Sequence, residues 1–375
     1  MKKFFVILAT VALVASAACT KVEKPATDEK ISFNVANYTP ATKANVSLVG
    51  ETTTFKSKAY LHAVGVTDVQ NFFGENGETI TANNTTNPSA WEPSHDYYWP
   101  KSKQSYINFV SWYDKNGTIT EATETTLKWT NRTIATDDNI MWADEAWRFN
   151  KNNNPATYHM NAVTEGVPTL FHHALAKLCI KAKATKVQGG TREENKTAWV
   201  ITLEDINISN TYNAGTLTLT NSDPSTGTTI AATTKAYTAA GTEKIGWTTS
   251  GTAAGISMDD TSELTTDLVN VLDEQSVLPQ TLSDDAKLTF TLHIITKYNG
   301  TQYSEEKIPV EVALNTLKGT ATGATAITAW EMNTKYTYNI IVDPETTVVK
   351  FDPAVVDWEV VSDAPTYTIP TGQID

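Results

Sequence analysis

The sequence has only two cysteines in 375 residues, Cys19 and Cys179. Two thiols cannot build a framework of several disulfides, so an exported form of this chain must rely on the size of its apolar core. The composition allows such a core, because 40% of the residues are hydrophobic and 19% are charged. The length suits two ordinary domains or one large β-domain.

Basic side chains are also scarce, with 29 Lys and Arg against 42 Asp and Glu. Nucleic acids require a basic footprint that neutralises phosphates, so no nucleic-acid partner is expected for a chain of net charge −13. Arginine is rarest of all and occurs only at Arg132, Arg148 and Arg192. A protease that cuts after arginine therefore has few positions at which to act.

Recognisable catalytic and metal motifs are missing: the chain has no HExxH, CxxC, GxSxG or Walker-type glycine loop. The best candidate is "FHHALAKLCI" (171–180), which holds His172, His173 and Cys179. As a strand it would separate His173 from Cys179 by about 20 Å, and as a helix it would separate His172 from Cys179 by about 10 Å. Neither geometry brings a thiolate to an imidazole, so a structural role is favoured and no catalytic residue is expected.

Two further clusters could each serve either as a structural element or as a binding site. The acidic segment "DDNIMWADE" (137–145) lacks the EF-hand spacing, so a solvated loop is favoured over a Ca²⁺ site and no metal or cofactor is expected. The aromatic segment "SAWEPSHDYYWP" (89–100) could bind a sugar. Its aromatic density is more typical of a sandwich core.

Strand signals dominate the rest of the chain, and no capped amphipathic helix stands out. "ISFNV" (31–35) alternates, with Ile31, Phe33 and Val35 on one face. Asn76-Gly77, Asn116-Gly117 and Asn299-Gly300 are candidate type I′ turns, the last within a long hairpin. Many short strands predict β-sandwiches in two sets that divide near 161–168. The periodicity of 171–182 fits both a helix and a strand.

The N-terminus has the pattern of an export signal, with Lys2 and Lys3 before the apolar run 4–14 and small residues up to Cys19. A cysteine at that point predicts a lipoprotein signal, whose thiol takes a diacylglyceryl group. Ser16 departs from the usual leucine, and the alternative is an ordinary secretory signal cleaved after Ala18. The polar segment 20–30 is typical of a solvated tether.

Several segments together resemble the fimbrillin family of Bacteroidales, the subunits of type V pili. Besides the lipoprotein signal, these are "ISFNVANYTPATKA" (31–44), "YYWPKSKQSYINFVSWY" (97–113), "DDNIMWAD" (137–144), "VPTLFHHALAKLCIKA" (167–182), "VLPQTL" (277–282), "WEMNTKYTYNIIV" (330–342) and "VKFDPAVVDWEV" (349–360). Their order and spacing carry the resemblance through most of the chain.

The resemblance implies an all-β protein of two transthyretin-like β-sandwich domains in tandem, with a C-terminal exchangeable tail. The implied division is a signal peptide (1–18), a lipidated tether with a removable first strand (19–44), an N-terminal domain (45–168), a C-terminal domain (169–354) and a donor-strand tail (355–375). It also implies that 171–180 is one strand opening the second domain. On such a strand Cys179 shares a face with Lys177 and Lys181, and we expect its thiol to be partly accessible.

The resemblance further implies how such a chain assembles. A protease removes the first strand, here Ile31, Phe33 and Val35, by a cut between Lys43 and Ala44. The family's site is usually arginine, so Lys43 puts the protease or the cleavage in question. The opened groove is filled by another subunit's C-terminal strand, for which the candidates are Val356, Trp358 and Val360, or Tyr367 and Ile369. The second set lies beyond the last expected core strand and is the better candidate; the alternative is that 355–369 pairs within its own subunit.

The sequence therefore predicts a non-enzymatic structural subunit of a fimbrium, a palmitate-bearing lipoprotein of the cell outer membrane that later joins an extracellular fimbrium. Its expected partners are other copies of itself or related fimbrillins, and the outer membrane through lipid on Cys19. The rival hypotheses are an anchor or tip subunit, and a monomeric surface lipoprotein that binds a host glycan or protein through 89–100 or the Asn/Thr-rich loops.

Overall fold

The computed structural model describes residues 30–37, 48, 51–86, 88–102, 104–144, 146–149, 166–187, 196–220, 244–249, 256–258, 262–318 and 324–358. These segments contain strands, a 3₁₀ turn at Leu314–Thr316 (η3) and no α-helix, which confirms the all-β prediction. Accordingly, no helix in the described segments has the length and hydropathy to cross a membrane.

A nine-stranded sheet forms one end of the molecule, in the order β10-β6-β9-β11-β1-β5-β4-β2-β3. A further pairing of β6 with β2 closes this sheet on itself around an aromatic core. Its strands are β1 (Phe33–Asn37), β2 (Thr54–His62), β3 (Gln70–Asn71), β4 (Glu78–Ala82), β5 (Trp91–Pro93), β6 (Tyr106–Asp114), β9 (Ile140–Ala143), β10 (Ala146–Phe149) and β11 (Val167–His173).

Two more sheets pack face to face at the other end and share one aliphatic core. One sheet holds β12 (Ala176–Ala184), β18 (Val269–Val277), β23 (Thr334–Asp343), β24 (Val348–Phe351) and β25 (Ala354–Asp357). The other holds β13 (Thr197–Ser209), β16 (Ile256–Met258), β17 (Ser262–Glu263), β20 (Lys287–Tyr298) and β21 (Thr301–Ala313). A small ladder joins β19 (Gln280–Thr281) to β22 (Ala329–Trp330). Two sheets that share a core in this way form a β-sandwich.

A four-stranded sheet joins the two ends of the molecule. It contains β7 (Glu121–Ala122), β8 (Thr126–Thr133), β14 (Ala214–Thr220) and β15 (Lys244–Thr249), and Leu217 pairs with Trp129 across it. A third core lies against it, with side chains from before and after residue 168. The division of the chain at 168 stays a prediction, but this sheet spans that point.

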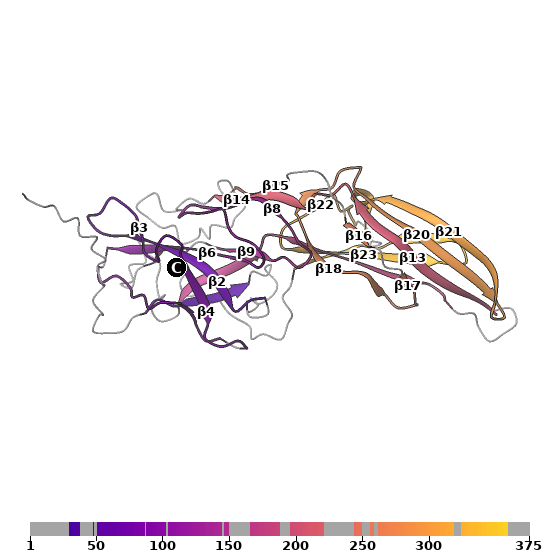
Figure 1. Cartoon of the computed structure of the whole chain (residues 1–375), viewed down its shortest axis with the longest axis horizontal. Helices are drawn as coiled ribbons and strands as arrows, with labels where there is room; N and C mark the ends of the chain where they lie inside the picture. The colour runs from indigo at the N-terminus through magenta and orange to yellow at the C-terminus, as the bar shows by residue number, and fades with distance from the viewer. Residues whose placement is uncertain are drawn as a thin grey trace, which may run out of the picture.

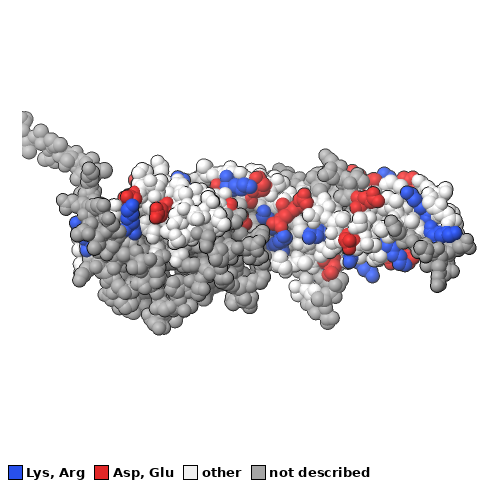
Figure 2. Space-filling view, turned by 90° about the horizontal axis from the view of Figure 1, so that it is seen from below, with Lys and Arg blue, Asp and Glu red and all other residues white. Residues whose placement is uncertain are grey.

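The molecule is elongated, with β2, β4 and β6 toward one end, β20 and β21 toward the other, and β8, β14 and β15 between them (Figure 1). On the face shown in Figure 2, lysines and arginines are interspersed with acidic residues. The described part of that face offers no continuous basic surface, in keeping with the acidic composition.

The long hairpin of β20 and β21 turns at Asn299 and Gly300, whose φ angles are 50° and 79°. Positive φ at both central residues is what a type I′ turn requires, so this predicted turn is confirmed. The other two predicted turns are wrong as type I′ turns. At Asn76-Gly77 only the glycine has positive φ, and at Asn116-Gly117 neither residue does.

Candidate functional site

Strand β1 and the residues before it place alternate side chains in the core of the closed sheet. Ile31, Phe33 and Val35 are 1%, 1% and 7% exposed, whereas Ser32 and Asn34 are intermediate. The alternation predicted for 31–35 is therefore confirmed. The five-residue strand β1 thus supplies two core side chains, and Ile31, just before it, supplies a third.

The backbone of this segment is held on both sides. β1 runs parallel to β11, from the pair Phe33–Val167 to the pair Asn37–Phe171. On the other side Phe33 pairs with Trp91 of β5, and the N–H of Ile31 donates to the carbonyl of Tyr97 at 2.8 Å. Removing β1 would leave two unpaired edges, which are templates for another strand.

Phe33 occupies the centre of the aromatic core. Its ring centroid lies 5.7 Å from that of Phe55, 6.3 Å from that of Phe73 and 5.5 Å from that of Phe109. The contacts with Phe55 and Phe109 are edge-to-face, the arrangement that aromatic quadrupoles favour. Loss of this side chain would leave a large apolar slot between the strands.

Gly166 allows β11 to approach β1. Its φ is +83°, and a Cβ built on it would lie 2.9 Å from the carbonyl carbon of Phe33. The N–H of the next residue, Val167, donates to the carbonyl of Ser32 at 2.7 Å. Residue 166 must therefore be a glycine both for its backbone conformation and for the space it leaves.

Glu78 fixes the segment that pairs with the start of β1. Its carboxylate accepts hydrogen bonds from the Tyr97 hydroxyl at 2.7 Å and from the Ser94 hydroxyl, and it contacts His95 Nδ1 at 3.0 Å. Burial opposes ionisation of Glu78, but these hydrogen bonds outweigh it and hold the pKa of the carboxyl below its usual value. The carboxylate therefore stays charged and keeps Tyr97 beside Ile31.

A second region of interest is the point at which the described chain ends. β25 pairs with β23 of its own chain, and the N–H of Trp358 then donates to the carbonyl of Asn333 at 2.9 Å. The indole is 5% exposed and stacks on His173 with ring centroids 3.8 Å apart. Burial, with the Lys177 ammonium as a further cause, lowers the pKa of His173 to about 3, so the imidazole is neutral.

The residues predicted for lipidation, processing and donation fall mostly beyond what the structure describes. Cys19, Lys43, Ala44, Val360, Tyr367 and Ile369 lie outside the described residues. Val356 is 53% exposed while Trp358 is buried, so the two do not form one apolar face in the described chain. The donor role of these residues stays a prediction.

The interpretation of 171–180 as one strand is wrong, because the chain forms β11 and β12, separated by the buried Ala174 and Leu175. Cys179 is 3% exposed, and its Sγ lies 3.2 Å from Thr337 Oγ1. The expected accessibility of its thiol is also wrong. β12 is an interior strand flanked by β18 and β23, and Thr337 of β23 is the register partner of Cys179.

The two histidines bind different partners. His172 Nε2 contacts Asp144 Oδ1 at 2.5 Å, and its ring stacks on Trp142. His173 Nδ1 contacts Asn139 Oδ1 at 3.0 Å. Each imidazole is thus held by a structural neighbour in the core, and the fold does not bring His173 to Cys179.

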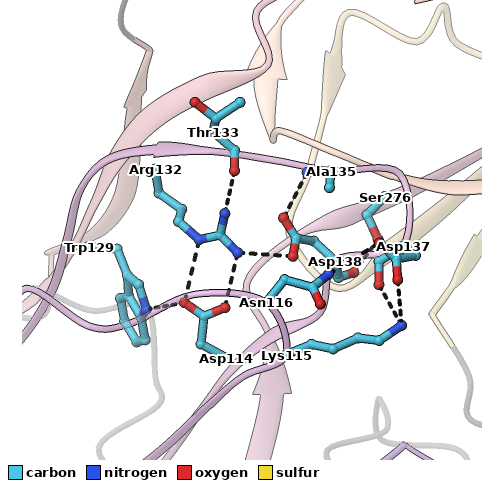
Figure 3. Close-up of polar contacts among 10 residues, drawn as sticks. All are labelled: Asp114, Lys115, Asn116, Trp129, Arg132, Thr133, Ala135, Asp137, Asp138 and Ser276. Atoms are coloured by element: carbon cyan, nitrogen blue, oxygen red, sulfur yellow. Dashed lines mark hydrogen bonds and ion pairs between the residues drawn. The ribbon is translucent and has the colours of Figure 1, made fainter.

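Asp137 and Asp138, at the start of the acidic segment, form ion pairs with Lys115 and Arg132 (Figure 3). Arg132 Nη2 lies 3.1 Å from Asp114 Oδ1 and 2.9 Å from Asp138 Oδ1, and the side chain of Asp138 is fully buried. Lys115 pairs with Asp137 at 2.9 Å. The interpretation as a solvated loop is wrong for Asp138, and the described residues contain no group of three or more side chains that could hold a metal ion.

The role of Arg132 could not be read from the sequence, because Asp114 lies 18 residues away. The aromatic segment 89–100 is as expected: Trp91 and Trp99 are 2% and 1% exposed and belong to the core around Phe33. The prediction of a core role is confirmed for these two tryptophans. They present no ring surface on which a sugar could stack.

Comparison with known protein families gives a match over most of the chain. A family model described as fimbrillin-like matches residues 42–358. No curated protein sequence matches the chain. The fold is similar to a fimbrial protein from Bacteroides vulgatus, at 14% identity and a TM-score of 0.48 over 88% of this chain and 99% of that one.

Two other solved structures are similar at comparable coverage. A cell adhesion protein from Bacteroides uniformis is 17% identical, with a TM-score of 0.46 over 88% of this chain and 100% of that one. The tip fimbrial protein Mfa3 from Porphyromonas gingivalis, truncated at its C-terminus, is 7% identical, with a TM-score of 0.33 over 88% and 100%. The family model covers far more than half of the sequence, and this structural, non-enzymatic chain therefore belongs to the fimbrillin-like family.

Proposed function

We propose that this chain is a structural subunit of a cell-surface fimbrium, a type V pilus, that polymerises by exchange of a β-strand. The observation that carries the proposal is the seating of β1. A short segment near the N-terminus fills the centre of a core with Ile31, Phe33 and Val35. Its excision would leave an apolar slot that another chain can complete.

The proposal includes the route by which the subunit reaches its site. The chain is exported as a lipoprotein with its lipid on Cys19 and is attached to the outer membrane through that lipid. Its two halves, 45–168 and 169–354, are transthyretin-like sandwich domains. Two of the three apolar cores support two domains, since the aromatic core lies in residues 31–171 and the aliphatic core in residues 176–342. Phe171 of β11 belongs to the aromatic core, so the cores favour a boundary after β11 over one at 168.

Processing is proposed between Lys43 and Ala44. This bond follows β1, which ends at Asn37, so a cut there releases the whole strand from the rest of the chain. The slot is then filled by the C-terminal tail of another copy or of a related fimbrillin. In the tail, Tyr367 and Ile369 present apolar side chains at the spacing of two that a replacement for Phe33 and Val35 requires.

Limited digestion of the purified precursor with trypsin tests the proposal. We expect a new N-terminus at Ala44, followed by ladders that resist SDS, and we expect Lys43→Ala to suppress both. An intact monomer after digestion would refute the subunit role. Deletion of residues 361–375 should abolish the ladders and leave the thermal unfolding of the monomer unchanged; ladders from this deletion would refute the donor assignment.

A second candidate function is an anchor subunit that keeps both its lipid and its first strand. The close seating of β1 between β11 and β5, together with a lysine where the family usually has arginine, favours this alternative. An anchor should accept the tail of a processed subunit only through a different surface. Resistance of the Lys43–Ala44 bond to trypsin in the native precursor would therefore favour the anchor over the polymerising subunit.

A further inference from the structure

The side chains of β25 contribute little to holding this strand on its sheet. It has four residues and lies at the edge of its sheet, paired only with β23. Ala354, Val355 and Val356 are all exposed, the two valines at 50% and 53%. A short edge strand whose valines face solvent gains little from burial, so something beyond it must keep it in place.

Trp358 supplies the missing attachment. Its indole stacks on His173 with an interplanar angle of 7°, and the Lys177 ammonium lies 4.7 Å from the centroid of the indole. The indole belongs to the third core, beside the four-stranded sheet, with Ala174, Leu175 and Leu278. The tryptophan that follows an exposed strand is thus seated where the two ends of the molecule join.

The backbone around Trp358 is equally determined. Its N–H donates to the carbonyl of Asn333, and the N–H of Asn333 donates to the carbonyl of Leu175 at 3.0 Å. Asn333 has a φ of 58°, a conformation that asparagine tolerates better than most residues. This turn aims its carbonyl at Trp358 and ties the end of β25 to the segment between β11 and β12.

We propose that Trp358 is a positioning residue that anchors the root of the C-terminal tail. In this inference, which rests on the proposed function, β25 stays with its own subunit and only residues after 358 are donated. Removal of Trp358 would uncover His173, which is 2% exposed, whereas Val355 and Val356 of β25 are already 50% and 53% exposed. The 17 residues 359–375 can span roughly 56 Å when extended, enough to form a strand outside their own subunit.

A disulfide across β23 and β25 tests the inference. Lys335 and Val356 are register partners, so Lys335→Cys with Val356→Cys can be closed in a Cys19→Ser background. We expect the oxidised and reduced forms to yield equal SDS-resistant ladders after trypsin. Ladders from the reduced form alone would overturn the inference. Lys297→Cys with Gln302→Cys, a register pair in the β20–β21 hairpin, is the matched control.

Trp358→Ala tests the anchor itself. We expect the amides of β25 to exchange with solvent at least tenfold faster than in the wild type and the ladders to weaken. A disulfide between cysteines introduced at positions 335 and 356 should restore both the slow exchange and the ladders. A variant that had lost its fold would not be rescued in this way. Unchanged exchange in Trp358→Ala would overturn the inference. If the wild type forms no ladders, the proposed function fails, and the exchange measurement on the monomer still decides for or against the anchor.

Discussion

Gly166 lies so close to the backbone of Phe33 that a Cβ at position 166 would be 2.9 Å from the Phe33 carbonyl carbon. We therefore expect Gly166→Ala to lower the free energy of unfolding by about 2–4 kcal/mol, through both the strained φ and the displaced strand. Urea denaturation of the precursor measures it.

Gly65→Ala is the matched control for this substitution. Gly65 has a similar φ of +76°, but a Cβ there would have nothing within 4 Å. It should lose only the part due to backbone strain, about 1 kcal/mol. Equal losses in the two variants would mean that residue 166 is constrained by its conformation alone and not by β1.

Phe33→Ala should destabilise the precursor by about 3–5 kcal/mol, because it empties the centre of an aromatic core. In a chain that has been cut after residue 43 and has lost β1, the same substitution should leave the stability of the remaining chain unchanged. Thermal unfolding of both forms makes the comparison. A loss that persists after the cut would show that the cleaved strand stays in its slot. Asn34→Ala, on the opposite face of β1, is the control.

Arg132→Met should cost about 3–5 kcal/mol, since it leaves the buried Asp138 without its positive partner. Lys115→Met removes the exposed pair with Asp137 and should cost less than about 1 kcal/mol. Denaturant unfolding of the two variants side by side gives both values. Similar small losses would show that other donors satisfy Asp138.

The stability of the protein should depend on the protonation of His173. The pKa of this imidazole is lowered to about 3 by burial, whereas histidine in an unfolded chain has a pKa near ~6.5. Between these values the unfolded chain binds a proton that the folded chain does not. The stabilisation is therefore complete above pH ~6.5 and is lost as the pH falls, at up to about 1.4 kcal/mol per pH unit.

His173→Gln removes the titrating group, and its free energy of unfolding should fall less steeply between pH 6.5 and 5 than that of the wild type. His95→Gln changes a histidine whose side chain is 75% exposed and serves as the control. Parallel pH profiles for the wild type and His173→Gln would contradict the burial of a neutral imidazole under Trp358.

Thiol reagents should modify Cys179 slowly in the folded protein, because its Sγ is covered next to Thr337. The rate should rise in urea in step with unfolding. Labelling within the mixing time in native buffer would contradict the interior position of β12. A Cys19→Ser background leaves Cys179 as the sole thiol, so the signal has one source.

Local patterns gave the parts of the fold that depend on neighbouring residues. The alternation of Ile31, Phe33 and Val35 and the positive φ at Asn299-Gly300 both follow from side-chain spacing and turn chemistry within a few residues. The all-β class follows from many such segments. These features need no knowledge of what lies across the sheet.

Contacts between residues far apart in the chain could not be predicted from the sequence, for a physical reason. Trp129 pairs with Leu217 and His173 stacks on Trp358, and no periodicity encodes which distant strand lies alongside. The exposure of Cys179 was misjudged in the same way, because strand alternation assigns faces without saying whether both faces are covered. The break at Ala174-Leu175 lacks the Gly, Pro or Asn that usually marks one.

The direction of β1 has a consequence for the shape of any assembly. A strand that reproduces its hydrogen bonds must run parallel to β11 and antiparallel to β5. Under the proposed strand exchange, each incoming segment would enter the slot in one orientation only, so successive copies would join head to tail and not face to face. Such heterologous contacts give an open filament with two chemically different ends unless the rotation between neighbours closes them into a ring.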